Sequence, residues 1–125
     1  MKNSVLIFWL VLIALIVIGV GASFLIKAKP GQYDSLAQCL TDKGVIFYGA
    51  FWCPHCQNTK RMFGNSARLL PYFECSTPDG QGQVQACKDK GISSYPTWVF
   101  PDGKILTGEH TLQELSSASG CPLTQ

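Results

Sequence analysis

The chain has 125 residues, 46% of them hydrophobic, and a formal net charge of +2 at pH 7. This length leaves room for one modest domain. The small net charge and the absence of a basic stripe exclude nucleic acid as an expected partner. Six cysteines are many for so short a chain, and they indicate an oxidising compartment outside the cytoplasm.

The first element is an apolar stretch, residues 5–26, that carries no charge. At about 22 residues it is long enough to cross a ~30 Å hydrocarbon layer as a helix. The alternative is a cleaved signal peptide with a weak cleavage site near residues 19–23, but signal-peptide cores are usually only about 7–15 residues long. We therefore expect residues 1–29 to be a single-pass membrane anchor with its flanks. Lysines flank the stretch on both sides, so only the cysteine content places the remaining chain in the periplasm or outside the cell.

Residues 30–125 carry alternating helix and strand patterns and form the second expected domain. The predicted elements are a helix at 35–43, a strand at 45–48, a helix at 54–63 with a further turn at 66–70, a strand at 72–75, a helix at 84–90, strands at 97–100 and 105–107, and a helix at 111–120. Two capping boxes, Ser35 with Gln38 and Thr111 with Glu114, predict where the first and last of these helices begin. This order favours an α/β fold with a central mixed sheet flanked by helices.

Cys53 and Cys56 are separated by two residues at the point where the first strand gives way to a helix. If Pro54 is the first helical residue, Cys53 is the N-cap, and the unpaired amides of the first turn stabilise its sulfur as a thiolate. Such a sulfur attacks disulfides and leaves readily from mixed disulfides, which predicts thiol–disulfide exchange. His55 is either an ordinary solvent-facing side chain or, when protonated, adds positive charge that tunes this thiolate.

A zinc site is the alternative for Cys53 and Cys56, with Cys75 and Cys87 as further ligands. The apolar strand just before the pair favours redox exchange, so we predict no metal and no bound cofactor.

The four cysteines outside this pair allow three disulfide pairings. A bond between Cys75 and Cys87 would clamp the loop between them, and a bond between Cys39 and Cys121 would close nearly the whole domain. Buried free thiols remain the alternative.

Two motifs flank predicted strands. Trp52-Cys53-Pro54-His55-Cys56 follows the first predicted strand, and Tyr95-Pro96-Thr97 precedes the third predicted strand. Together they resemble the thioredoxin superfamily, over about residues 33–120. The resemblance implies a thioredoxin fold in which Cys53 is the exposed nucleophile and Cys56 the resolving cysteine.

The same resemblance assigns roles around the pair. Pro96 would be cis rather than trans, the usual form of an X-Pro bond, and the backbone of Tyr95 would pair with a bound substrate. Trp52 would belong to an apolar collar around the disulfide, or else fill the core, and Trp98 is expected to face the core. One position departs from the pattern: the buried carboxylate of the family is replaced by Phe47, which leaves Glu74 or water to move the proton of the resolving cysteine.

A narrower resemblance comes from segments 47–56, 63–64, 70–75 and 95–98. They are similar to the thioredoxin-like domain attached to bacterial vitamin K epoxide reductase (VKOR) homologues, which passes electrons to a membrane-embedded reductase part. The Pro54-His55 dipeptide is also that of the DsbA-like periplasmic oxidases, so the active-site motif is Cys-Pro-His-Cys (CPHC). The resemblance therefore implies a membrane-tethered bacterial protein whose redox partner is a separate protein.

These observations predict a membrane-tethered, extracytoplasmic thiol–disulfide oxidoreductase that acts mainly as a protein disulfide oxidase. Its substrates would be cysteine-containing secreted or periplasmic proteins, and a VKOR-like or other quinone-linked membrane oxidoreductase would reoxidise it. Two alternatives stay open: a membrane-anchored reductase of the kind that serves cytochrome c maturation, and a non-catalytic thioredoxin-fold binding module or metal carrier.

Overall fold

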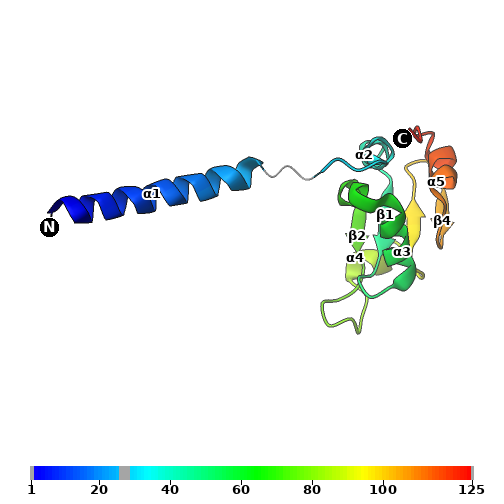
Figure 1. The fold of residues 1–125 in the computed structure, drawn as a ribbon. Helices are drawn as coiled ribbons and strands as arrows, with labels where there is room; N and C mark the ends of the chain where they lie inside the picture. The colour runs from blue at the N-terminus through cyan, green and yellow to red at the C-terminus, as the bar shows by residue number, and fades with distance from the viewer. Residues whose placement is uncertain (1, 26–28, 125) are drawn as a thin grey trace.

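The computed structural model describes residues 2–25 and 29–124 of the chain. Helix α1 (Lys2–Leu25) contains the stretch Asn3–Gly21, which has a mean hydropathy of 2.9 and is not buried against the protein (Figure 1). A helix of this length and composition can cross a membrane, although a signal sequence near the N-terminus has the same properties. Residues 1 and 26–28, which belong to the expected anchor and its flanks, lie outside the described part of the chain.

Four short strands form one mixed sheet in the order β2-β1-β3-β4. The central strand β1 (Ile46–Gly49) pairs in parallel with β2 (Tyr72–Glu74) and antiparallel with β3 (Thr97–Val99), and β3 pairs antiparallel with β4 (Ile105–Thr107). Successive side chains of a strand point to opposite faces, so the buried residues of β1 supply both faces of the sheet.

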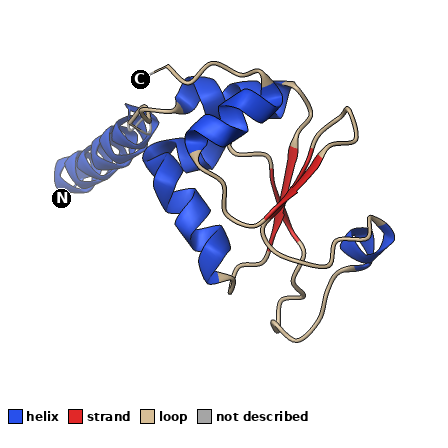
Figure 2. Ribbon diagram, turned by 90° about the vertical axis from the view of Figure 1, so that its right-hand side faces the viewer, coloured by secondary structure: helices blue, strands red, loops and turns tan. Residues whose placement is uncertain are grey.

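The helices cover both faces of this sheet (Figure 2). The elements are α2 (Asp34–Asp42), α3 (Pro54–Phe63), the 3-10 helix η1 (Gly64–Leu69), α4 (Gln85–Asp89) and α5 (Leu112–Ser119). Phe47 belongs to the larger buried cluster, which includes residues of α2, α3 and α5. Its neighbour Tyr48 belongs to a smaller cluster on the α4 side. The order and layers are those predicted, and they make a thioredoxin-like fold preceded by an apolar helix.

The start of α2 differs from the prediction. No side chain caps this helix, and its N-cap residue is Tyr33, so the expected capping box of Ser35 with Gln38 is wrong. The backbone amide of Tyr33 donates to Ser66 Oγ (2.9 Å), and Arg68 binds both carboxylate oxygens of Asp34 (2.7 and 2.8 Å). Contacts with η1 therefore set the N-cap of this helix two residues earlier than the local pattern indicates.

The capping box at α5 is confirmed. The amide of Glu114 donates to Thr111 Oγ1, and the amide of Thr111 donates to the Glu114 carboxylate. Because both bonds form within one turn, neighbouring residues alone determine this helix start.

Two disulfides join segments of the domain, and they are the two pairings expected from the sequence. Cys39 in α2 is bonded to Cys121, just after α5, and Cys75 at the end of β2 is bonded to Cys87 in α4. The first bond spans 82 positions of the chain and the second spans 12. The remaining two cysteines, Cys53 and Cys56, are free thiols.

Candidate redox site

The free thiols lie at the point where β1 leads into α3. Cys53 is the N-cap of α3, with an extended backbone, and Pro54 occupies the first helical position, as expected. The backbone amide of Cys53 donates to Ala50 O (3.0 Å), which fixes the tight turn between strand and helix. The free amides of the first turn of α3 consequently point toward the Cys53 end of the helix.

Gly49, the last residue of β1, permits the close packing beneath this turn. A β-carbon at this position would lie 2.7 Å from Tyr72 Cε2 and 2.9 Å from Cys56 Sγ. Both distances are too short for a real contact, so the site requires glycine. The edge of the Tyr72 ring and the Cys56 sulfur thus both lie against the same side of Gly49.

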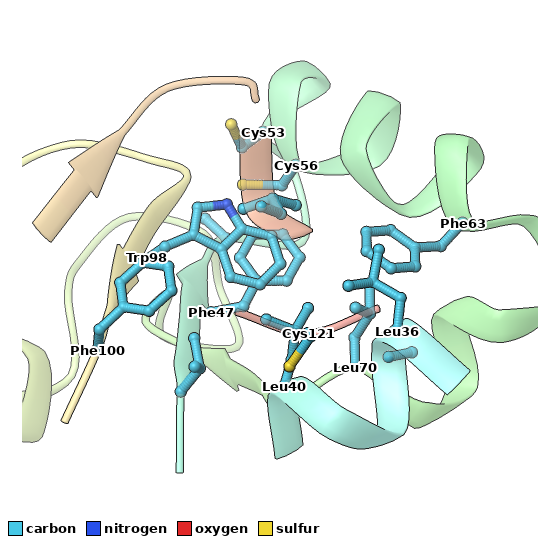
Figure 3. Close-up of a cluster of buried hydrophobic side chains, with 14 residues drawn as sticks. Leu36, Leu40, Phe47, Cys53, Cys56, Phe63, Leu70, Trp98, Phe100 and Cys121 are labelled. Atoms are coloured by element: carbon cyan, nitrogen blue, oxygen red, sulfur yellow. The ribbon is translucent and has the colours of Figure 1, made fainter. Parts of the chain in front are cut away.

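The two cysteines differ in their access to solvent. Cys53 is 4% exposed and Cys56 is completely buried, and both sulfurs lie on the same side of the stacked rings of Phe47 and Trp98 (Figure 3). The description of Cys53 as an exposed nucleophile is therefore wrong for the free protein, because its thiol turns inward and donates to Tyr95 O (3.7 Å). A partner that approaches from outside can still reach Cys53 more readily than Cys56.

Burial, with a smaller contribution from the neighbouring Cys53, raises the pKa of the Cys56 thiol to about 12. The backbone of Ala50 and the charge of Lys60 act in the opposite direction but do not offset the burial. Cys56 is consequently a protonated thiol at neutral pH.

This raised pKa predicts how the dithiol form responds to alkali. The unfolded chain loses the Cys56 proton near pH 9, whereas the folded chain keeps it until about pH 12. Between these values the unfolded state binds fewer protons, so stability falls as pH rises, by about 1.4 kcal/mol per pH unit. Anaerobic urea unfolding at pH 8 and pH 10.5 should show a loss of roughly 2 kcal/mol that the Cys56→Ser variant lacks. Equal losses in both proteins would contradict this assignment.

The Tyr95–Pro96 peptide bond is cis, as the resemblance implied, and its loop lies against the thiols. Pro96 is buried, and the Tyr95 hydroxyl is held by Gln83 Nε2 (2.7 Å). The Tyr95 carbonyl faces the Cys53 thiol. The burial of Pro96 and the hydrogen bond to the Tyr95 hydroxyl thus hold the Tyr95 carbonyl in place.

An aromatic rim surrounds the position of Cys53; it consists of Phe51, Trp52 and Tyr95. Phe51 and Trp52 are 47% and 53% exposed, so Trp52 does not fill the core. Its indole Nε1 donates to Ser76 Oγ (2.9 Å), and its ring makes an edge contact with the Tyr95 ring. Trp98, by contrast, is fully buried as expected.

His55 projects from the first turn of α3 and pairs with a residue that the sequence analysis did not identify. Its Nδ1 lies 2.5 Å from Glu109 Oε1, and Asn58 Nδ2 donates to the same oxygen (2.9 Å). The Asn58 hydrogen bond and the His55 contact lower the pKa of Glu109. Any positive charge on His55 is therefore partly offset by a carboxylate, and its effect on Cys53 is weaker than the Pro-His dipeptide alone implies.

Glu74, the suggested substitute for the missing acid, binds Tyr72 and the backbone at Phe51 and Ser76 rather than Cys56. Its carboxylate accepts hydrogen bonds from the Tyr72 hydroxyl (2.7 Å) and from the amides of Phe51 and Ser76 (3.2 and 2.9 Å). The floor under the thiols is the Phe47–Trp98 stack, with ring centroids 4.4 Å apart. Trp98 Nε1 is the one buried side-chain nitrogen or oxygen in the described part of the chain that has no hydrogen-bond partner.

The zinc alternative loses two of its four ligands, because Cys75 and Cys87 are joined in a disulfide. Within residues 2–25 and 29–124, no group of three or more His, Cys, Asp or Glu side chains is arranged to hold a metal ion.

Fold and site together define a thioredoxin-like protein with a free Cys-x-x-Cys pair opposite a cis-proline. No family model matches the chain. The thiol-disulfide oxidoreductase LTO1 of Arabidopsis thaliana is 44% identical to it over 96 residues, which cover 73% of this chain and 25% of LTO1. The chain therefore spans about a quarter of the length of this curated relative.

Proposed function

We propose that the protein is a membrane-tethered, extracytoplasmic thiol–disulfide oxidoreductase that acts mainly as a disulfide oxidase of cysteine-containing secreted or periplasmic proteins. The observation that carries this proposal is the placement of Cys53 as N-cap of α3, against Tyr95 O, with Cys56 buried behind it. The similarity to a relative named as a thiol-disulfide oxidoreductase supports it.

The reaction starts from the Cys53–Cys56 disulfide. A substrate thiolate attacks Cys53 Sγ, a mixed disulfide forms, and Cys56 leaves as a thiolate that takes a proton. A second substrate thiolate then attacks the substrate sulfur of the mixed disulfide, and Cys53 leaves as a thiolate. The substrate has gained a disulfide, and its two electrons now reside on the Cys53–Cys56 dithiol.

The helix start explains why Cys53 is the sulfur that is attacked and released. The free amides at the N-terminus of α3 favour negative charge on the N-cap sulfur, whereas Cys56 lies in a buried apolar setting. We assign substrate contact to the aromatic rim residue Trp52 and to the Tyr95–Pro96 loop, whose backbone carbonyl at Tyr95 faces Cys53.

The proposed site of action follows from α1. A helix that anchors the domain in the cell membrane keeps the dithiol close to membrane-embedded partners. We propose that a VKOR-like or other quinone-linked membrane oxidoreductase takes the electrons from Cys53 and Cys56 and restores their disulfide.

A second candidate function is that of a membrane-anchored reductase. The contact between His55 and Glu109 favours it, because a carboxylate beside His55 disfavours negative charge on Cys53, which makes the disulfide less oxidising.

The reduction potential of the Cys53–Cys56 pair separates the two functions. A value near about −120 mV supports the oxidase, and one near about −270 mV supports the reductase. The Cys56→Ser variant, expressed in the native host, should trap partners on Cys53 as mixed disulfides. If the protein is an oxidase, we expect the trapped proteins to be secreted proteins together with a multi-span membrane protein. Trapped cytochrome-assembly proteins would instead indicate the reductase.

A further inference from the structure

A lysine and a tyrosine lie beside the buried thiol. Lys60 follows Cys56 by four residues in α3, so both side chains lie on the same face of the helix. Lys60 Nζ lies 3.4 Å from the centroid of the Tyr72 ring, and the edge of this ring lies next to Cys56 Sγ. The ammonium group is therefore held over an aromatic face that adjoins the sulfur.

The Tyr72 ring is fixed from two sides. Its hydroxyl donates to Glu74 Oε2 (2.7 Å), and Phe47 makes an edge contact with its ring at a centroid distance of 5.2 Å. Tyr72 and Phe47 also face each other in the register of β1 and β2. A ring constrained in this way can hold the Lys60 charge in one place.

We propose that Lys60, positioned by Tyr72, stabilises the Cys56 thiolate electrostatically in a site where Phe47 replaces the family's carboxylate, while water takes the proton. This inference rests on the proposed function, because it concerns the step in which Cys56 acts. Lys60 is a positioning and tuning residue here, since Cys53 and Cys56 alone exchange bonds.

The thiolate in question arises in both directions of exchange. When the pair is reoxidised, the Cys56 thiol gives its proton to water, and the thiolate attacks Cys53 Sγ of the mixed disulfide and expels the partner's thiolate. When a substrate is oxidised, Cys56 leaves as the same thiolate. A fixed positive charge lowers the cost of this buried anion without accepting a proton.

Few other titratable groups face Cys56 from the surrounding elements. The α3 side provides Cys53 and Lys60, and β2 provides Tyr72, whose hydroxyl is bound by Glu74. Strand β1 contributes no charged side chain. From the cis-proline loop, Tyr95 has its hydroxyl bound by Gln83. Lys60 is thus the cation of this set.

The test uses the full-length chain in detergent and follows its reaction with 5,5′-dithiobis(2-nitrobenzoate) by stopped flow. Cys53 attacks first and releases one thionitrobenzoate, and Cys56 then closes the disulfide and releases the second. We expect Lys60→Met to slow the second release about tenfold at pH 7 and to move its pH profile about one unit upward, because loss of a nearby opposite charge raises the pKa of a thiol. The first release should stay unchanged.

Three controls separate charge from structure. Lys60→Arg keeps the cation and should restore the second release to within about threefold of the wild type, and Lys88→Met removes an exposed lysine of α4 and should change neither step. Tyr72→Leu removes the ring that positions the ammonium group and should behave like Lys60→Met. The proposal is overturned if Lys60→Met leaves the second release unchanged or slows both steps equally. Failure of the proposed function would look different, since the first release would then be missing in every variant.

Discussion

Cys53→Ser is expected to abolish reaction with disulfides, whereas Cys56→Ser should stop the reaction after the first bond has formed. The thiolate is the reactive form of cysteine. Without Cys53 the chain keeps one free thiol, Cys56, which is completely buried, and burial is the largest cause that raises its pKa. Such a thiol is almost entirely protonated at pH 7. We therefore expect the rate to fall by roughly two orders of magnitude or more.

The measurement is the reaction of each variant with oxidised glutathione at pH 7, followed by intact mass. Wild type should end as the internal disulfide, Cys56→Ser as a stable glutathione adduct, and Cys53→Ser without any adduct. Circular dichroism should be the same for all three, because serine is close in size to cysteine. An adduct on Cys56 in the Cys53→Ser variant would assign the roles of the two cysteines the other way round.

The parts of the site that sequence alone predicted are those that depend on neighbouring residues. Proline is favoured at the first helical position, so Pro54 makes Cys53 the expected N-cap, as observed. The same holds for Thr111 and Glu114, which cap α5 within one turn. Such features can be inferred from a single sequence, because the interacting groups are close along the chain.

The parts that sequence did not reveal depend on contacts between distant segments. Glu109 meets His55 across 54 positions, and no residue pattern indicates that pairing. The Tyr72 ring reaches Cys56 only because β2 lies beside β1 in one particular register. The burial of Cys53 likewise depends on the Tyr95 loop, 42 positions away.

The start of α2 shows how a local signal can mislead. Ser35 and Gln38 have the spacing of a capping box, yet Gln38 donates to Asp42 within the helix. The ion pair between Asp34 and Arg68 and the bond from Tyr33 to Ser66 begin the helix earlier. Tertiary contacts therefore override a weak local preference here.

Removal of the Cys39–Cys121 disulfide is expected to cost the largest share of stability. The bond closes a loop of 82 positions, and in the chain-entropy account a loop of this length stabilises the fold by about 4–5 kcal/mol. A small domain is commonly stable by about 5–15 kcal/mol, so the double variant Cys39→Ala, Cys121→Ala should be close to unfolding. Urea denaturation of the full chain in detergent, followed by circular dichroism, measures the loss.

The second disulfide provides the matched comparison. Cys75–Cys87 spans only 12 positions, for which the same account predicts about 3 kcal/mol. The variant Cys75→Ala, Cys87→Ala should therefore lose less stability than the Cys39→Ala, Cys121→Ala variant. It should affect the site more, however, because the loop that it loosens carries Ser76, the hydrogen-bond acceptor of Trp52 Nε1. If this variant were the less stable of the two, loop length would not govern these disulfides, and local packing of α4 against the sheet would be the dominant contribution.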